Sequence, residues 1–139
     1  MILVDTSAWV EYLRATGHPF DVAMQGLVSA DRILITEPVV MELLAGAGSL
    51  RRVEALRTAL AHHVIAPVGS LETYEAAAEI YRVCRSGGDP VQGAMDCVIA
   101  AVAIREEVPI LAADRDFEVI ARHTSLRLHP VDPTRRYGR

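Results

Sequence analysis

The sequence predicts a three-layer α/β/α fold with a central, mainly parallel sheet. Short unbroken apolar runs, which are typical of buried parallel strands, alternate with helical segments from one end of the chain to the other. The 139 residues include 51% apolar residues but only 5% aromatic ones, which suits a compact domain. We therefore expect helices on both faces of the sheet and one domain over residues 1–139, with a flexible tail at residues 130–139.

The first predicted strand is the apolar run of residues 1–4, which stops abruptly at Asp5. Parallel strands place functional groups just past their carboxyl ends, where the chain turns into a helix and a crevice opens. The run is therefore expected to deliver the Asp5 carboxylate to one edge of the sheet. Thr6 and Ser7 follow, and either hydroxyl can cap the next helix.

That helix is predicted to stop at residues 17–19 and to turn Trp9 and Leu13 towards the core. The later elements are bounded mainly by glycine and proline, which end helices and strands or occupy the first turn of a helix. In chain order we expect helices over residues 21–29, 37–45, 49–62, 70–86, 92–106 and 116–123, and strands over residues 32–36, 64–68, 109–114 and 126–128.

The composition excludes several classes of protein. The net charge is −4 and all 14 basic residues are arginine, so the chain has neither a P-loop lysine nor a Schiff-base lysine. Cys84 and Cys97 have no cysteine or histidine at metal-binding spacing, which is typical of small buried residues in a reducing compartment. No signal peptide and no membrane-spanning run is visible, so we expect a cytoplasmic protein without a membrane partner.

Four carboxylates occupy places where acidic residues are unusual. Asp5 and Asp114 follow apolar strands, Asp96 lies near the start of the most apolar helix, and Glu42 is flanked by apolar residues. Helical spacing predicts that the Asp96 carboxylate faces protein, and the same reasoning applies to Glu42. Taken singly, each acid has an ordinary explanation as a helix cap, a solvated side chain or the partner of an arginine.

Taken together, these acids indicate a cation site. Two carboxylates 4 Å apart repel each other by about 4 kcal/mol at an effective dielectric constant of 20, so a cluster must hold protons or bind cations. A set of oxygen ligands without cysteine or histidine suits a hard ion such as Mg²⁺ or Mn²⁺. That chemistry predicts phosphodiester hydrolysis by a metal-activated water.

Four motifs with characteristic order and spacing cover nearly the whole chain. They are Ile-Leu-Val-Asp-Thr-Ser at residues 2–7, Glu-Leu-Leu-Ala-Gly at 42–46, Asp-Cys-Val-Ile-Ala-Ala-Val-Ala at 96–103 and Leu-Ala-Ala-Asp-Arg-Asp-Phe at 111–117. In these motifs the sequence resembles the PIN-domain family and, within it, the VapC-type ribonuclease toxins of type II toxin–antitoxin pairs. The resemblance implies a PIN-like fold and a metal-dependent endoribonuclease that cleaves cellular RNA, namely tRNA or ribosomal RNA. It also implies a homodimer and a VapB-type antitoxin that fills the acidic crevice.

The resemblance further implies site residues. It makes Asp5, Glu42, Asp96 and Asp114 catalytic, and it assigns Asp5, Asp96, Asp114 and Asp116 to the Mg²⁺ or Mn²⁺ ion. The role of Asp116 stays open, because this residue would reach a second ion, act through water or cap the last helix.

Two hydroxyl positions complete the implied site. Thr6 or Ser7 would be a ligand or a substrate contact. Ala112 departs from the family pattern, since relatives often carry a hydroxyl residue near the end of this strand; the four acids are unaffected.

An acidic pocket would repel RNA unless cations guide the backbone, and guanidinium groups bind phosphate bidentately. Arg115 lies between two acids and is expected to be an internal ion-pair partner. The candidate RNA contacts are Arg14, Arg51, Arg52, Arg85, Arg115 and the tail residues Arg135, Arg136 and Arg139, with the ion-pair role favoured for Arg115. For most of these arginines a solvated surface position is the ordinary alternative.

Three other hypotheses use the same acids. A phospho-acceptor signalling module also clusters aspartates at strand ends, but it usually needs a lysine, which this chain lacks. An aspartyl phosphatase would need an Asp-x-Asp motif, where this chain has Asp5-Thr6-Ser7. The third is a degenerate module that binds RNA without hydrolysing it.

Overall fold

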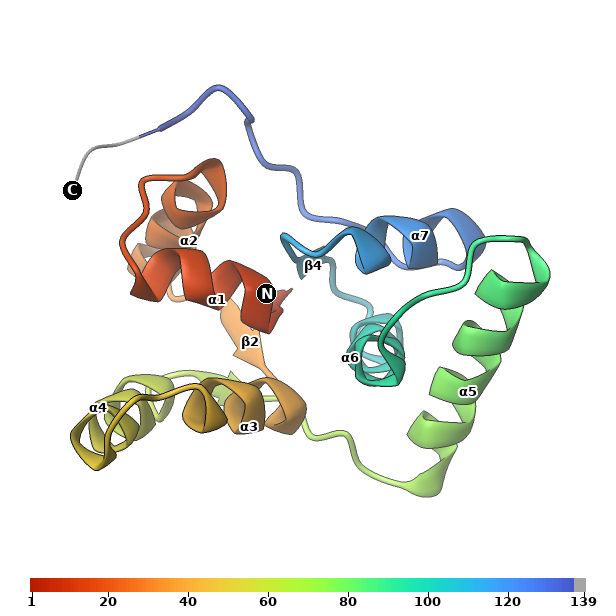
Figure 1. Ribbon diagram of the computed structural model, residues 1–139, viewed down its shortest axis with the longest axis horizontal. Helices are drawn as coiled ribbons and strands as arrows, with labels where there is room; N and C mark the ends of the chain where they lie inside the picture. The colour runs from red at the N-terminus through yellow and green to blue at the C-terminus, as the bar shows by residue number, and fades with distance from the viewer. Residues whose placement is uncertain (137–139) are drawn as a thin grey trace.

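The computed structural model describes residues 1–136, which form four strands and seven helices (Figure 1). The elements are β1 (Ile2–Val4), α1 (Thr6–Leu13), α2 (Pro19–Ser29), β2 (Ile33–Ile35), α3 (Glu37–Ala45), α4 (Leu50–Leu60), β3 (Val64–Ile65), α5 (Leu71–Ser86), α6 (Ala94–Arg105), β4 (Ile110–Leu111) and α7 (Arg115–His123). The strands are shorter than the apolar runs that predicted them, whereas most helices begin and end within about two residues of the expected positions.

The sheet is parallel throughout, with the strand order β3-β2-β1-β4. Ile2 pairs with Ile33 on one side of β1, and Leu3 pairs with Ile110 on the other. Because β1 lies between β2 and β4, the carboxyl ends of the first and last strands lie side by side. The predicted three-layer α/β/α fold is confirmed.

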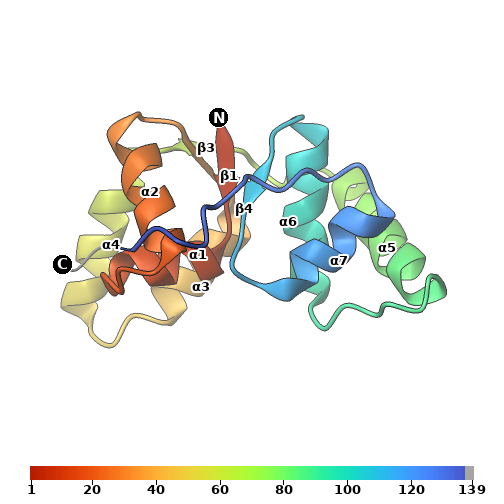
Figure 2. The same cartoon turned by 90° about the horizontal axis from the view of Figure 1, so that it is seen from above.

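The helices form the two outer layers. α1 and α2 lie on one face of the sheet, and α3 and α6 lie on the other (Figures 1 and 2). α4 packs against α3, while α5 and α7 pack against α6 beside β4. The α6 helix is therefore enclosed by the sheet and by neighbouring helices.

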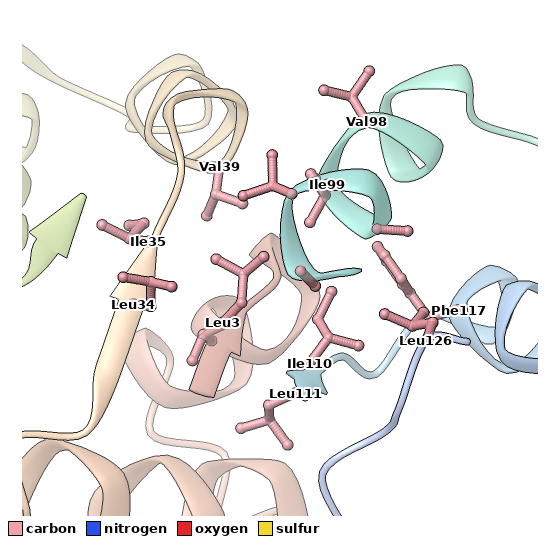
Figure 3. Close-up of a cluster of buried hydrophobic side chains, with 14 of the residues drawn as sticks. Leu3, Leu34, Ile35, Val39, Val98, Ile99, Ile110, Leu111, Phe117 and Leu126 are labelled. Atoms are coloured by element: carbon pink, nitrogen blue, oxygen red, sulfur yellow. The ribbon is translucent and has the colours of Figure 1, made fainter. Parts of the chain in front are cut away.

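Burial explains the apolar strands and helices. Leu3, Ile35 and Leu111 are fully buried, and Val39 and Ile99 reach the same core from the helices above the sheet (Figure 3). In α6 all residues from Cys97 to Ala103 are buried. A helix with so little exposed surface needs an almost unbroken apolar sequence, as residues 97–103 have.

Two expectations about single elements are wrong. Leu13 is 42% exposed, whereas Trp9 is buried, because Leu13 ends α1 and lines a hollow between α1, α3 and α4. The predicted strand over residues 126–128 is reduced to one bridge between Ile110 and Leu128. β4 has only two residues, so few of its backbone groups can form hydrogen bonds with residues 126–128.

The segment after this bridge continues along the molecule. The His129 amide donates a hydrogen bond to the Ile110 carbonyl at 2.8 Å, and Val131 packs against the core. No helix within residues 1–136 is long and apolar enough to cross a membrane. The flexibility of the tail stays a prediction.

Candidate active site

Asp5 lies between β1 and α1 and is only 4% exposed. It is the N-cap of α1: its Oδ2 atom accepts hydrogen bonds from the Ser7 amide at 3.0 Å and from Ser7 Oγ at 2.6 Å. Burial raises the pKa of the Asp5 carboxyl, the Ser7 hydrogen bonds oppose this rise, and the charge of Glu42 adds to it. The fold thus holds an acid that would gain from a nearby cation.

The hydroxyls that were expected as caps have other partners. Ser7 Oγ accepts a hydrogen bond from the Ala113 amide at 2.8 Å and so links the start of α1 to the loop after β4. Thr6 Oγ1 donates one to Glu42 Oε1 at 3.0 Å, which links α1 to α3. Asp5 itself caps α1, because its carboxylate reaches the free amide of Ser7 in the first turn.

Three aspartates form the most compact acidic group. Asp96, Asp114 and Asp116 each offer a carboxylate oxygen, and these atoms lie within 4.8 Å of one another. Asp96 comes from the first turn of α6, while Asp114 caps α7 and accepts a hydrogen bond from the Asp116 amide at 2.9 Å. Two helix N-termini therefore point at one small volume, and both favour negative charge.

The pKa of Asp96 shows that the ionised form of this carboxyl is disfavoured in its surroundings. It is raised from 3.8 to about 8, first by burial and then by the charges of Asp5, Asp114 and Asp116. The charges of Asp5, Asp114 and Asp116 therefore all act on the Asp96 carboxyl. Asp96 is half-buried, which agrees with the expectation that its side chain faces protein.

Asp116 also holds the chain that enters α6. Its Oδ2 atom accepts hydrogen bonds from the Gln92 amide at 2.9 Å and the Gly93 amide at 3.3 Å. A Cβ atom on Gly93 would lie 3.3 Å from Asp96 Oδ2, so the glycine permits a close approach of backbone and carboxylate. Backbone amides carry no side-chain signal, so the sequence indicates these two only through the glycine next to the start of the helix.

Glu42 occupies a different part of the site from the one expected. It is exposed on α3, not turned into protein, and it lies outside the compact group of three aspartates. Glu42 is linked to the site by the hydrogen bond that Thr6 donates to it and by the effect of its charge on the pKa of Asp5. The charge of Glu42 thus raises the pKa of Asp5, and the charge of Asp5 in turn raises the pKa of Asp96.

The arginines named from the sequence are distributed over several surfaces. Arg14 and Arg52 line a hollow of about 620 Å³ that also includes Thr6 and Glu42. Arg51 is exposed on α4, and Arg85 lies on α5 over the Tyr81 ring at 5.8 Å from its centroid. Arg139 lies outside the described residues.

Arg115 does not behave as expected. Within residues 1–136 it has no ion pair, although Asp114 and Asp116 flank it. Both acids turn towards backbone amides, and Arg115 is exposed at the start of α7. The prediction of an internal ion pair is wrong.

Comparison with known proteins gives a consistent result. The sequence profile of the family described as "PIN domain" matches residues 2–123. The chain is 44% identical over 129 residues to VapC ribonuclease Mb1587 of Mycobacterium bovis and to ribonuclease VapC11 of Mycobacterium tuberculosis, covering 91% of this chain and 96% of each relative. It is also similar in fold to VapBC2 of Rickettsia felis, solved with a fragment of promoter DNA, with a TM-score of 0.74, 19% identity and coverage of 95% of this chain and 100% of that one.

Proposed function

Since this chain belongs to the PIN-domain family and, within it, to the VapC-type ribonuclease toxins, we propose that its acidic site is the centre of a divalent-metal-dependent endoribonuclease. The observation that carries the proposal is the approach of Asp96, Asp114 and Asp116 within 4.8 Å, with the buried Asp5 beside them. Such a group of carboxylates is stable at neutral pH only if it keeps protons or binds cations.

The donor set fits a hard divalent cation. Asp5, Asp96, Asp114 and Asp116 supply carboxylate oxygens, and the group contains no cysteine or histidine. Such ligands favour Mg²⁺ or Mn²⁺ over softer metals. When bound, the cation would lower the pKa of a water molecule and neutralise charge that develops on the phosphate oxygens.

The protein's own groups have separate tasks in this proposal. Ser7 and the Ala113 amide fix the Asp5 carboxylate and the loop that carries Asp114. Glu42, oriented by Thr6, is the exposed carboxylate that would accept a proton from the attacking water. Asp116 would bind the cation with one oxygen while it holds the start of α6 with the other.

The substrate we propose is RNA, because the relatives are named ribonucleases. The narrower class, tRNA or ribosomal RNA, is what the family resemblance implies and stays a prediction. Arg14 and Arg52 line the hollow that reaches Glu42, and a guanidinium there would hold a phosphate beside the acidic site. Arg51 precedes Arg52 on α4 and would extend this contact. Arg85 lies on another helix and would reach only an RNA that extends beyond the hollow.

A VapB-type antitoxin is the proposed protein partner. The structural neighbour from Rickettsia felis is VapBC2 bound to a DNA fragment. The hollow between α1, α3 and α4 offers a protein partner several apolar side chains. Leu13, Leu43 and Leu56 are among them, next to Glu42. A partner segment seated there would compete with RNA.

We also propose a homodimer, since large apolar side chains remain exposed on α3 and α5 at Met41, Leu71 and Tyr74.

The proposal is tested by cleavage of total tRNA and ribosomal RNA with Mg²⁺, Mn²⁺ or a chelator. Asp5→Asn and Asp96→Asn each remove one negative charge with little change of shape, and each should lower the cleavage rate by at least about 100-fold. Glu75→Gln, an exposed position on α5, serves as the control and should cleave normally. Full activity of either aspartate variant, or of the wild type in chelator, would refute the proposal.

A further inference from the structure

A second hollow, of about 480 Å³, lies beside the compact acidic group. It is bounded by the connection between α5 and α6 and by the first turns of α7, which run side by side in both views (Figures 1 and 2). Asp114 and Asp116 line it together with Gln92 and Arg115. It shares no lining residue with the hollow that includes Thr6, Glu42, Arg14 and Arg52.

Arg115 is the cationic group of this second hollow. Asp114 Oδ1 accepts the Asp116 amide, and Asp116 Oδ2 accepts the amides of Gln92 and Gly93. Both neighbouring acids are thus oriented by the backbone, and the exposed guanidinium forms no ion pair in the part of the chain that the structure describes. Its five N–H donors remain open to an anionic ligand.

The α5–α6 connection, which lines this hollow through Asp89 and Gln92, is held to α7 at two places. Asp89 Oδ2 lies 2.9 Å from His123 Nε2 and 3.7 Å from the Arg122 guanidinium, which ties the α5–α6 connection to the end of α7. The hydrogen bonds from Gln92 and Gly93 to Asp116 tie the same connection to the start of α7. A ligand that enters this hollow would therefore meet a largely preformed surface, which reduces the cost of ordering on binding.

We infer that this hollow binds the phosphodiester that adjoins the scissile one, with Arg115 as its guanidinium ligand and Gln92 beside the neighbouring nucleotide. The inference rests on the proposed ribonuclease function. An RNA strand that crosses an acidic site needs positive charge on both sides of it. Arg14 and Arg52 provide such charge at the Glu42 hollow, and Arg115 provides it at the Asp114 and Asp116 hollow.

The test measures RNA binding separately from cleavage. In an Asp96→Asn background, which is expected not to cleave, Arg115→Ala is titrated with a fluorescein-labelled single-stranded RNA of mixed sequence over a range of salt concentrations. Loss of a charge-assisted phosphate contact should raise Kd about tenfold. It should also reduce the slope of log K against log salt by about 0.7.

Two further variants make the result specific. Arg82→Ala removes the same charge from α5, where Arg82 pairs with Glu79 and lines neither hollow, and it should leave Kd unchanged. Arg115→Lys keeps the charge but not the planar fork, so its Kd should be intermediate. In the cleaving protein, Arg115→Ala should raise KM for total tRNA and leave kcat close to the wild-type value.

Several outcomes would overturn the inference. One is an equal Kd for Arg115→Ala and Arg82→Ala; another is a loss of kcat without a change in RNA affinity, which would mean that Arg115 acts on the acidic group. Weaker binding of the purified antitoxin with unchanged RNA affinity would assign the hollow to that protein. A protein that binds no RNA even with Arg115 intact would refute the ribonuclease proposal itself, and this result is distinguishable because every variant would share it.

Discussion

Ser7 Oγ donates a hydrogen bond to the Asp5 carboxylate at 2.6 Å and accepts one from the Ala113 amide at 2.8 Å. Ser7→Ala removes both bonds, so we expect the free energy of unfolding to fall by about 1–3 kcal/mol in urea denaturation. The hydroxyl also lowers the pKa of Asp5, and its loss should move the acidic limb of the pH–cleavage profile to higher pH. Ser29→Ala, at an exposed position in α2, is the control. An unchanged acidic limb would contradict this role of Ser7.

The raised pKa of Asp96 predicts a stability that depends on pH. Between the ordinary value of 3.8 and the folded value of about 8, the folded protein keeps a proton that the unfolded chain has released. Without metal, the free energy of unfolding should therefore fall as pH rises through this interval. Asp96→Asn cannot ionise, so in chelator it should lose much less stability than the wild type between about pH 5 and about pH 8. Thermal unfolding at the two pH values measures this difference. Equal losses of stability in the wild type and in Asp96→Asn would show that Asp96 does not cause the pH dependence.

Two substitutions separate the functions of Asp116. Asparagine removes the charge but can still accept the Gln92 amide, whereas alanine loses both properties. Asp116→Asn should weaken Mn²⁺ binding in calorimetric titration and leave stability in chelator close to the wild-type value or above it. Asp116→Ala should also lower the free energy of unfolding, by about 1–3 kcal/mol, because two amides lose their acceptor. If Asp116→Asn bound Mn²⁺ normally, Asp116 would be a structural residue only.

Gly87 fits closely against His123. A Cβ atom at position 87 would lie 2.5 Å from His123 Cε1, so Gly87→Ala must displace the ring and disturb its contact with Asp89. We expect a loss of stability in urea denaturation and slower RNA cleavage, because the same connection leads to Gln92.

Gly26→Ala is the matched control. This glycine is exposed within α2, and a Cβ atom there would meet nothing within 4 Å. Alanine should stabilise the protein by roughly 0.5–1 kcal/mol through its higher helix propensity. A destabilised Gly26→Ala variant, or a neutral Gly87→Ala variant, would contradict the packing described here.

The sequence predicted those features that depend on burial and on local order. The uniformly apolar residues 97–103 required an enclosed helix, and the apolar run before Asp5 required a central strand. It did not predict the exposure of Leu13, because helical spacing defines a face but not how far the neighbouring sheet extends along it.

The site was predictable as a set of acids but not as an arrangement. Which carboxylates come within 4.8 Å depends on where α6 and α7 begin relative to each other, and that is a tertiary property. The backbone amides of Gln92 and Ala113 carry no side-chain signal at all. For the same reason Arg115 was assigned to its sequence neighbours, although the backbone already satisfies those acids.

The contact between Ser7 and Ala113 joins positions 106 residues apart. A ribosome makes the first of these positions early and the second close to the end of the described chain, and domains fold as units once their parts are available. A nascent chain that has not yet exposed the loop after β4 has Asp5, Glu42 and Asp96 but lacks Asp114 and Asp116. Under the proposed function, a toxin that is still being translated would thus be harmless to the RNA of the machinery that makes it.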